Sequence, residues 1–418
     1  MSYQKYENYR DSGVEWLGNI PCGWKIKALR YLADPITGLT YSPQDVTLPE
    51  DGTLVLRASN IQNGKLDIEG QSNVYVDTRI PQKLKIQGED ILVCSRNGSR
   101  HLIGKNALIS NPDREMTFGA FNTVLRGQHN QFLYWVLNSK LFEFQSARFL
   151  TSTINQLTIG TFKTLRIPFP SKLEQGAISK FLSEQTEEID RLIKKKEKLL
   201  ALLGEKRTAL ISQAVTKGLD PTAPMKSSGI EWLGEIPAGW QLIKLRFLCK
   251  INTGSRDTEN RVADGKYPFF VRSQTIENIN SYALDTEAVL TAGDGAGVGK
   301  VFHYFNGKFD YHQRVYAFTD FHKTSGKFFF HFFSQFFGLQ MNIYSAKSTV
   351  DSVRRPFLQE LFFCVPPEDQ QNEIVNYVEK ETKYFEEVES KVEFAISKLK
   401  EYRSALITNT VTGKIKVT

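Results

Sequence analysis

Hydrophobic residues recur at steps of three, four and seven along two long stretches of the chain. In the first stretch, from about 173 to 212, the apolar positions are Ile178, Leu182, Ile189, Leu192, Leu199, Leu203 and Leu210. In the second, they are Ile374, Val378, Phe385, Val388, Val392, Ala395, Leu399, Tyr402 and Leu406. Such steps place the side chains on one face of a helix, as the a and d positions of a coiled coil do. Each stretch therefore predicts a long helix with one apolar face.

The two stretches are copies of one another. Residues 203–216 and 399–412 are identical at eight of fourteen positions, at a constant offset of 196. An ordinary buried helix is the alternative interpretation of each pattern. The face from 178 to 210 spans about 50 Å at 1.5 Å per residue, however, which is long for a helix buried in one globule. Two similar helices with apolar faces are natural partners, and we expect an antiparallel pair.

A second repeat precedes the variable part of each half. Residues 12–24 read SGVEWLGNIPCGW and residues 228–240 read SGIEWLGEIPAGW. Over 12–32 and 228–248, thirteen of twenty-one residues are identical. Two tryptophans and one proline within nine residues predict an extended arm that is anchored by aromatic burial. We expect this motif to serve packing.

The repeats divide the chain into arm, variable segment and helix, twice. The variable segments contain β-prone runs, such as 54–56 and 269–271, and a probable helix at 131–142 that matches 327–338. We expect a mixed α/β fold with two globular domains, separated by the helix pair and related by an internal pseudo-two-fold repeat. The expected parts are an N-terminal arm (1–32), a first globular domain (33–168), a central long helix (169–216), a linker and second arm (217–248), a second globular domain (249–364) and a C-terminal long helix (365–418).

Composition narrows the class of partner and the compartment. The 418 residues carry a net charge of +7, with a pI near 9.0, which favours a polyanionic partner. The four cysteines are scattered, with no CxxC pair and no Cys/His spacing typical of zinc, so a reducing cytoplasm fits best. The N-terminal residues have no apolar signal region, and the Phe-rich run 328–337 is too short and too polar to span a bilayer.

Motifs that would carry catalysis are missing from the sequence. The glycine-rich turn at 293–300 is not a Walker A loop, because Asp294 and Val301 stand where Gly and Ser or Thr are required. A tight turn is the expected use of these glycines, although such turns can also approach a DNA backbone. The Asn/Asp-Pro-Pro-aromatic tetrapeptide of adenine methyltransferases is absent, and the six histidines form no metal-binding pair. We therefore expect no catalytic residue and no metal site.

Side chains suited to base edges or phosphates concentrate in the variable segments. Arg can bind guanine through two hydrogen bonds, and Asn or Gln can bind adenine in the same way. An ordinary surface or turn residue is the alternative for each one. The candidates in the first segment are Arg57, Ser59, Asn60, Arg96, Asn97, Ser99, Arg100 and Lys105. Those in the second are Arg272, Ser273, Gln274, Lys300, His312, Gln313 and Arg314.

Together, the repeated motifs resemble the specificity subunits of type I restriction-modification systems. The resemblance covers both halves and rests on the S-G-[IV]-E-W-L-G-x-I-P arm and the R-[ST]-A-L-I helix ends. It also rests on the prolines that precede the helices, Pro170 and Pro366, with Gln175 and Gln371 after them. The variable segments resemble the family only in their place between arm and helix, and their residues differ.

The resemblance implies a non-catalytic DNA-binding subunit. Each of two target recognition domains would read one half of a split, asymmetric site in double-stranded DNA, and the helix pair would set the spacer. The expected partners are two adenine methyltransferase subunits and restriction/translocase subunits. No cofactor is expected on this chain, because S-adenosylmethionine, and ATP with Mg²⁺, would belong to the partners. Two rival hypotheses remain open: a coiled-coil scaffold that binds no DNA, and an enzyme with an unrecognised site.

Overall fold

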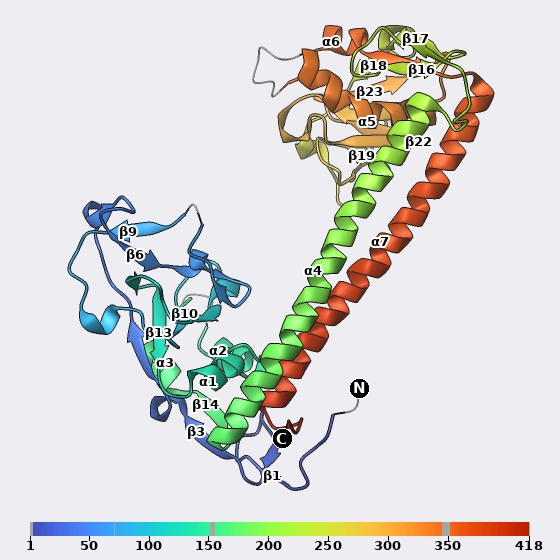
Figure 1. Ribbon diagram of the computed structural model, residues 1–418. Helices are drawn as coiled ribbons and strands as arrows, with labels where there is room; N and C mark the ends of the chain where they lie inside the picture. The colour runs from blue at the N-terminus through green and yellow to red at the C-terminus, as the bar shows by residue number, and fades with distance from the viewer. Residues whose placement is uncertain (1–2, 71, 151–154, 345–351, 418) are drawn as a thin grey trace. The chain divides into compact units, whose positions relative to one another are not determined.

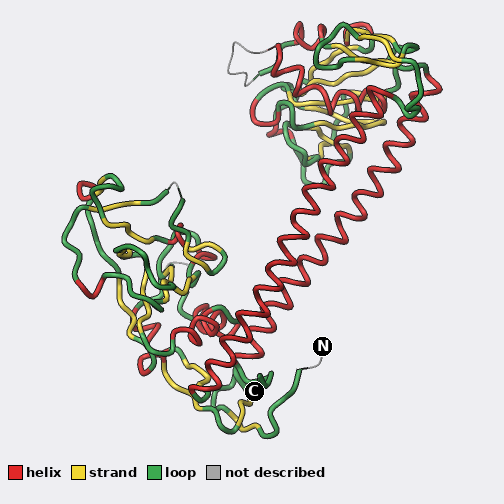
Figure 2. Tube along the Cα trace, in the orientation of Figure 1, coloured by secondary structure: helices red, strands yellow, loops and turns green. Residues whose placement is uncertain are grey.

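Two compact units make up the computed structural model, which describes residues 3–70, 72–150, 155–344 and 352–417 (Figures 1 and 2). Unit 1 comprises Met1–Lys196 and Phe394–Thr418, and unit 2 comprises Glu197–Glu393. The long helices α4 (Lys172–Lys217) and α7 (Glu368–Val411) contribute residues to both units. The prediction of a mixed α/β chain with two long helices is confirmed.

The two long helices run antiparallel within each unit. In unit 1, Arg403 of α7 forms an ion pair with Asp190 of α4 at 2.8 Å. Tyr6 donates a hydrogen bond to Glu174 at the start of α4, and its neighbour Tyr9 donates one to the Gly413 carbonyl just beyond α7. The start of α4 therefore lies beside the end of α7. In unit 2, Arg207 of α4 and Glu389 of α7 lie 3.4 Å apart.

The packed face of α4 departs from the predicted one at two positions. Leu192 and Leu199 are 38% and 42% exposed, whereas Ile193, which was not predicted, is 8% exposed. An α-helix has 3.6 residues per turn, so a strict seven-residue repeat drifts around a straight helix. The buried side therefore moves to neighbouring residues after Ile189. On α7 most of the predicted face is buried, and Tyr402, at 42% exposure, is the departure.

Short sheets form the first globular domain and its arm. Strands β4, β10, β11 and β13 form a sheet in the order β11-β10-β13-β4, and a second sheet has the order β12-β6-β9-β5. Strands β6 and β12 are parallel. The strands of unit 1 are β1 (Tyr9–Asp11), β2 (Asn19–Pro21), β3 (Lys25–Ala28), β4 (Asp34–Thr37), β5 (Val46–Thr47), β6 (Thr53–Leu56), β7 (Ile61–Gln62), β8 (Lys65–Leu66), β9 (Val74–Val76), β10 (Ile91–Cys94), β11 (Asn106–Leu108), β12 (Met116–Phe118), β13 (Asn122–Arg126) and β14 (Arg166–Phe169).

One six-stranded sheet, in the order β18-β23-β21-β22-β19-β20, forms the second globular domain. Its strand β22 pairs with both β21 and β19, whereas in the first domain β11 and β12 share these two pairings. The two domains thus share one arrangement of strands. The place of the long strand β22 in the second domain is taken by two separate strands, β11 and β12, in the first. The strands of unit 2 are β15 (Met225–Ser227), β16 (Glu235–Pro237), β17 (Gln241–Lys244), β18 (Lys250–Thr253), β19 (Tyr267–Phe270), β20 (Glu277–Ile279), β21 (Leu284–Ala292), β22 (Phe302–Tyr311), β23 (Val315–Thr319) and β24 (Phe362–Val365).

The helix predicted at 131–142 is broken in two. Its halves are α1 (Asn130–Leu137) and α2 (Lys140–Ala147), whereas the matching α5 (Gly326–Tyr344) is continuous. Asn138 and Ser139 both donate side-chain hydrogen bonds to carbonyls of α1, which competes with helix continuation. The remaining α-helices among the described residues are α3 (Ile159–Thr164) and α6 (Arg355–Glu360).

Aromatic burial holds the arms and the second domain, as predicted for the arms. Trp24 and Trp240 are 2% and 1% exposed. In unit 2 the phenylalanines of α5 continue this core, with the Phe329 ring stacked on Phe363 at 4.5 Å between centroids. The same cluster reaches Val215 of α4 and Val378 of α7. The ends of the helices in unit 2 are therefore part of the domain's core, and the globular domain packs against them.

Candidate nucleic-acid interface

Three loops of the second domain meet at Asp294. This residue lies in the glycine-rich turn after β21, Arg272 follows β19, and Arg314 lies between β22 and β23. Nη1 of Arg272 donates to Oδ1 of Asp294 at 3.0 Å, and Nη1 of Arg314 donates to Oδ2. The arginine side chains are 42% and 61% exposed, and that of Asp294 is 15% exposed. Two solvent-facing guanidinium groups are thus fixed by one carboxylate.

The charge state of this cluster follows from its contacts. Partial burial raises the pKa of the Asp294 carboxyl, but hydrogen bonds from Arg314 and Arg272 outweigh it and hold the pKa below its ordinary value. Asp294 is therefore ionised at neutral pH, and the three side chains together carry a net positive charge. An exposed cationic group of this kind is suited to a DNA surface.

The glycines explain how Asp294 reaches both arginines. A Cβ on Gly293 would lie 3.0 Å from the Arg314 carbonyl oxygen, and one on Gly297 would lie 2.6 Å from the Arg272 carbonyl oxygen. Gly295 has a φ of +71°, which favours glycine. The turn thus approaches the protein's own backbone, and its glycines serve the tight turn predicted for them.

The other candidates of the second domain lie on the same loops. His312 is 2% exposed, and its Nδ1 accepts a hydrogen bond from the Arg314 main-chain nitrogen at 2.9 Å. Burial and the nearby Arg272 lower the pKa of this imidazole, so it is neutral at pH 7. Gln313 donates to Asp257 at 2.8 Å. His312 shapes the loop, while Gln313 is exposed.

Ser273, Gln274 and Lys300 form the remaining part of this surface. All three are exposed. The Gln274 amide donates to the Lys300 carbonyl at 2.8 Å, and the Ser273 hydroxyl donates to the Thr275 carbonyl at 3.0 Å. The imidazole Nε2 of His303 lies 3.0 Å from the Ser273 carbonyl oxygen. The structure therefore brings all seven predicted residues of this domain onto adjoining loops.

In the first domain, the group around Arg57 has a different character. Asn60 is 2% exposed, and its amide nitrogen donates to the Asp67 carbonyl and to Asn73 Oδ1 at 3.0 and 2.7 Å. Its Oδ1 accepts from the Arg57 main-chain nitrogen, and the Arg57 guanidinium donates to the Ser72 carbonyl. These contacts assign Asn60 to holding the loop. Ser59 is exposed.

The other five predicted residues of the first domain lie on the turn after β10 and at its end. Arg96, Ser99 and Arg100 are exposed, and Asn97 and Lys105 are half-buried. The Arg96 guanidinium lies over the Phe121 ring, 5.2 Å from its centroid. Asn97 Oδ1 accepts from the Ser99 main-chain nitrogen at 2.9 Å. Phe121 is 61% exposed and was not among the predicted residues.

Backbone pairing makes Arg96 and Phe121 equivalent to Asp294 and Arg314. Cys94 pairs with Asn122 in the first domain as Ala292 pairs with Val315 in the second. The residues after Cys94 and Ala292 donate main-chain hydrogen bonds to the carbonyls of Phe121 and Arg314, at 3.0 and 2.8 Å. One pair of positions thus holds an arginine over an aromatic ring in one domain and an ion pair in the other.

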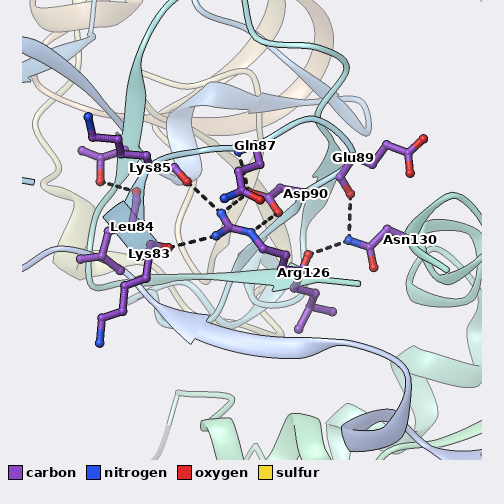
Figure 3. Close-up of polar contacts among 10 residues, drawn as sticks. Lys83, Leu84, Lys85, Gln87, Glu89, Asp90, Arg126 and Asn130 are labelled. Atoms are coloured by element: carbon purple, nitrogen blue, oxygen red, sulfur yellow. Dashed lines mark hydrogen bonds and ion pairs between the residues drawn. The ribbon is translucent and has the colours of Figure 1, made fainter. Parts of the chain in front are cut away.

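A further arginine of the first domain, Arg126, is partly buried and makes its contacts within the protein. Arg126 forms two hydrogen bonds with Asp90, at 2.9 and 2.7 Å, and donates to the carbonyls of Lys83 and Lys85 (Figure 3). Asp90 is 1% exposed. Next to it, Asn130 ties the Glu89 carbonyl to the start of α1. With its contacts made inside the protein, Arg126 fastens the loop before β10 to β13.

Neither a metal site nor a membrane span is found in the described part of the chain. Within residues 3–70, 72–150, 155–344 and 352–417, no three His, Cys, Asp or Glu side chains are grouped to hold a metal ion. Over these same residues, the helices lack the apolar length needed to cross a membrane.

Comparison with known proteins identifies the family. A family model described as the type I restriction modification DNA specificity domain matches residues 21–201 and again residues 237–393. The StySPI specificity subunit of Salmonella potsdam is 24% identical over 428 residues, covering 95% of this chain and 90% of the relative. The EcoKI specificity subunit of Escherichia coli (strain K12) is 30% identical over 205 residues, covering 47% and 44%.

Solved structures share the fold. A chain from a structure concerned with complex assembly and conformational transition of the type I R-M system has a TM-score of 0.72, at 15% identity, and covers 94% of this chain and 98% of that one. The HsdS subunit from Thermoanaerobacter tengcongensis has a TM-score of 0.52, at 15% identity, with 95% and 98% covered. With its family model matched twice over most of its length, the chain belongs to the type I restriction-modification DNA specificity family and is a specificity subunit with two repeated recognition domains.

Proposed function

We propose that each recognition domain reads one half of a bipartite, asymmetric site in double-stranded DNA, and that the subunit itself performs no catalysis. The observation that carries this proposal is the pair of equivalent positions at 96/121 and 294/314. The strand pairing around these positions is the same in both domains, but the side chains there differ in charge and shape. Two domains that recognise different base sequences need the same backbone arrangement with different polar side chains on it.

The long helices are proposed to set the spacer between the two half-sites. This idea is supported by the continuity of α4 and α7, each of which contributes to both compact units. It is also supported by the continuous core of unit 2, which joins the helix ends to the second domain. A reader that is fixed to a helix end transmits any change in helix length to the position of its half-site.

Two copies of a methyltransferase subunit are the proposed partners, with restriction/translocase subunits joining them, in the cytoplasm. Tyr31 and Phe247 occupy equivalent positions in the two arms and are 69% and 60% exposed. Arg30 lies over the Tyr31 ring at 4.9 Å, and Arg246 lies over the Phe247 ring at 5.0 Å. A surface that is kept in both copies suits one kind of partner bound twice, whereas the reading loops differ. S-adenosylmethionine, and ATP with Mg²⁺, are assigned to these partners.

An exchange of one reader tests the proposal. Residues 33–150 are replaced by the equivalent segment of a relative with a different target, and the methylated sites are mapped in cells that contain the methyltransferase subunits. One half-site should change while the other stays the same. A simultaneous change of both halves would contradict the two-reader model. Methyl transfer by the isolated chain would contradict its non-catalytic role.

The scaffold hypothesis makes a different prediction. A scaffold would bind its partners but would show no preference among duplex DNA sequences, with or without them. Filter binding to a randomised duplex pool therefore separates the two. In a separate capture assay with the methyltransferase subunits, Tyr31→Ala combined with Phe247→Ala should weaken their binding, while the melting temperature of the chain stays unchanged. Full capture by this double variant would remove the arms from the docking surface.

A further inference from the structure

The arginine pair of the second domain is built for directional hydrogen bonding. Asp294 uses one carboxylate oxygen for Arg272 and the other for Arg314, and each contact occupies a single Nη1 atom. A guanidinium has five N–H donors, so each arginine keeps donors free on its exposed side. Two parallel donors on one arginine match O6 and N7 of guanine in the major groove.

The carboxylate that orients them is itself fixed. Asp294 forms a backbone bridge with Ser352, and the neighbouring Gly293 carbonyl accepts a hydrogen bond from Val353 at 2.7 Å. The Gly293 nitrogen in turn donates to the Arg314 carbonyl. An arginine anchored in this way loses less freedom when it binds a base than an unrestrained one does.

The equivalent place in the first domain points to the same use. There Arg96 lies over the exposed Phe121 ring, so an arginine is again held by a neighbouring side chain at the end of the same strands. If the ion pairs of Asp294 served only to join loops, we would expect an acidic residue at the equivalent place in the first domain. That place has Arg96 and Phe121 instead. The shared property of the two places is an oriented, solvent-facing arginine.

We propose that Asp294 is a positioning residue which orients Arg314 and Arg272 to read guanine in the half-site of the second domain. This inference rests on the proposed function. It adds that the base recognised is guanine and that Asp294 positions the arginines that recognise it. The equivalent positions in the first domain, Arg96 and Phe121, take the corresponding place against the other half-site.

Asp294→Asn is the central test, because it keeps the shape of the side chain and removes the charge. The full chain, with its methyltransferase subunits, is used to select bound sequences from randomised duplex DNA. In the variant, the preference for guanine at one or two positions of one half-site should fall about tenfold, within the range for loss of a bidentate contact. The other half-site should be unchanged.

Arg314→Lys provides a second variant that keeps the positive charge but removes the paired donors. It should lose the same guanine preference while its binding to non-specific DNA keeps the salt dependence of the wild type. Arg261→Gln is the matched control, because Arg261 forms an exposed ion pair with Glu277 in the same domain. The control should return the wild-type sequence profile.

The outcomes separate the inference from the proposed function. If the wild type returns no preferred sequence, the proposed function fails and the inference fails with it. If the wild type has a preference that Asp294→Asn and Arg314→Lys both preserve, only the inference is overturned. Uniform weakening on all sequences would assign the arginines to phosphates and would likewise overturn it. A melting temperature equal to that of the wild type verifies that each variant is folded.

Discussion

The indole Nε1 of Trp24 donates a hydrogen bond to the Glu174 carboxylate over 2.9 Å, and Trp240 makes the equivalent bond to Gln370 over 2.8 Å. In both copies, the bond joins the arm to the first turn of a long helix. Tyr6 adds a second donor to Glu174 in the first copy. The repeat has thus kept an indole and an acceptor while the charge of the acceptor has changed.

This relationship predicts the effect of substitutions at Trp24. Trp24→Ala should lower the free energy of unfolding by about 3–5 kcal/mol, because a buried indole is lost. Trp24→Phe retains most of the packing. Loss of the indole hydrogen bond should lower the free energy of unfolding by about 1 kcal/mol, in addition to the effect of the smaller side chain. Glu174→Gln reproduces the acceptor of the second copy and should change stability by less than about 1 kcal/mol. Denaturant unfolding measures all three, and a neutral Trp24→Ala would refute the anchoring role.

The ion pair between the buried Asp90 and the partly buried Arg126 predicts a large effect in the first domain. Asp90→Ala leaves the Arg126 charge without its partner and should destabilise the domain by about 3 kcal/mol. Glu115→Gln, which removes an exposed pair with Lys85, is the control and should cost less than about 0.5 kcal/mol. Thermal unfolding of the full chain distinguishes them. Equal effects of the two substitutions would show that the Asp90 pair is not structurally important.

The imidazole of His331 makes the stability of unit 2 depend on pH. Burial lowers the pKa of this imidazole to about 4 from its ordinary 6.5, against the nearby Glu379, which raises it, and together with Lys327, which lowers it. Between these two pH values the unfolded chain binds a proton that the folded chain does not. The folded state should therefore lose stability as the pH falls from about 6.5 to about 4, with no contribution from this group above that window.

His331→Gln tests this pH dependence. The variant should show a flatter fall in the free energy of unfolding across the same window, measured by chemical denaturation at a series of pH values. Ser334→Ala, one helical turn away on α5, is the control and should keep the wild-type slope. A variant slope equal to that of the wild type would assign the pH dependence to other groups.

Shortening both long helices tests their role as a spacer. Removing 194–200 and 394–400 deletes one heptad from each helix and keeps the ion pairs of Asp190 with Arg403 and of Arg207 with Glu389. The pair shortens by about 10 Å at 1.5 Å per residue, which equals about three base pairs at 3.4 Å each. The preferred spacer should shrink by about this amount, or binding should be lost because one half-site is rotated.

A selection from DNA with randomised spacers measures the result. The original spacer returned at full affinity would contradict the role of the helices. Removal of 194–200 alone is the control, since it takes residues from only one helix and should destabilise the chain.

Much of the architecture could be predicted because it depends on local sequence patterns and on internal repeats. The spacing of Ile178, Leu182 and Ile189 determined a helix with one buried face, since helical periodicity depends only on neighbours along the chain. The duplicated Trp24 and Trp240 arms determined two equivalent halves. The predicted burial of Leu192 and Leu199 was wrong, because both side chains are exposed. Which side of a helix is buried depends on how a partner helix packs against it, and a sequence repeat does not specify that packing.

The reading surface is determined by the sequence only in part. Its arginines could be named from their chemistry, but the role of Asp294 and the exposure of Phe121 could not. The offset between the two copies is 216 at the arms and falls to 193 between Phe121 and Arg314, so the sequence repeat no longer aligns these positions. Only strand pairing places them together. Residues far apart in the chain meet because backbone hydrogen bonds fix the register of the strands that carry them, and that register is a property of the tertiary structure.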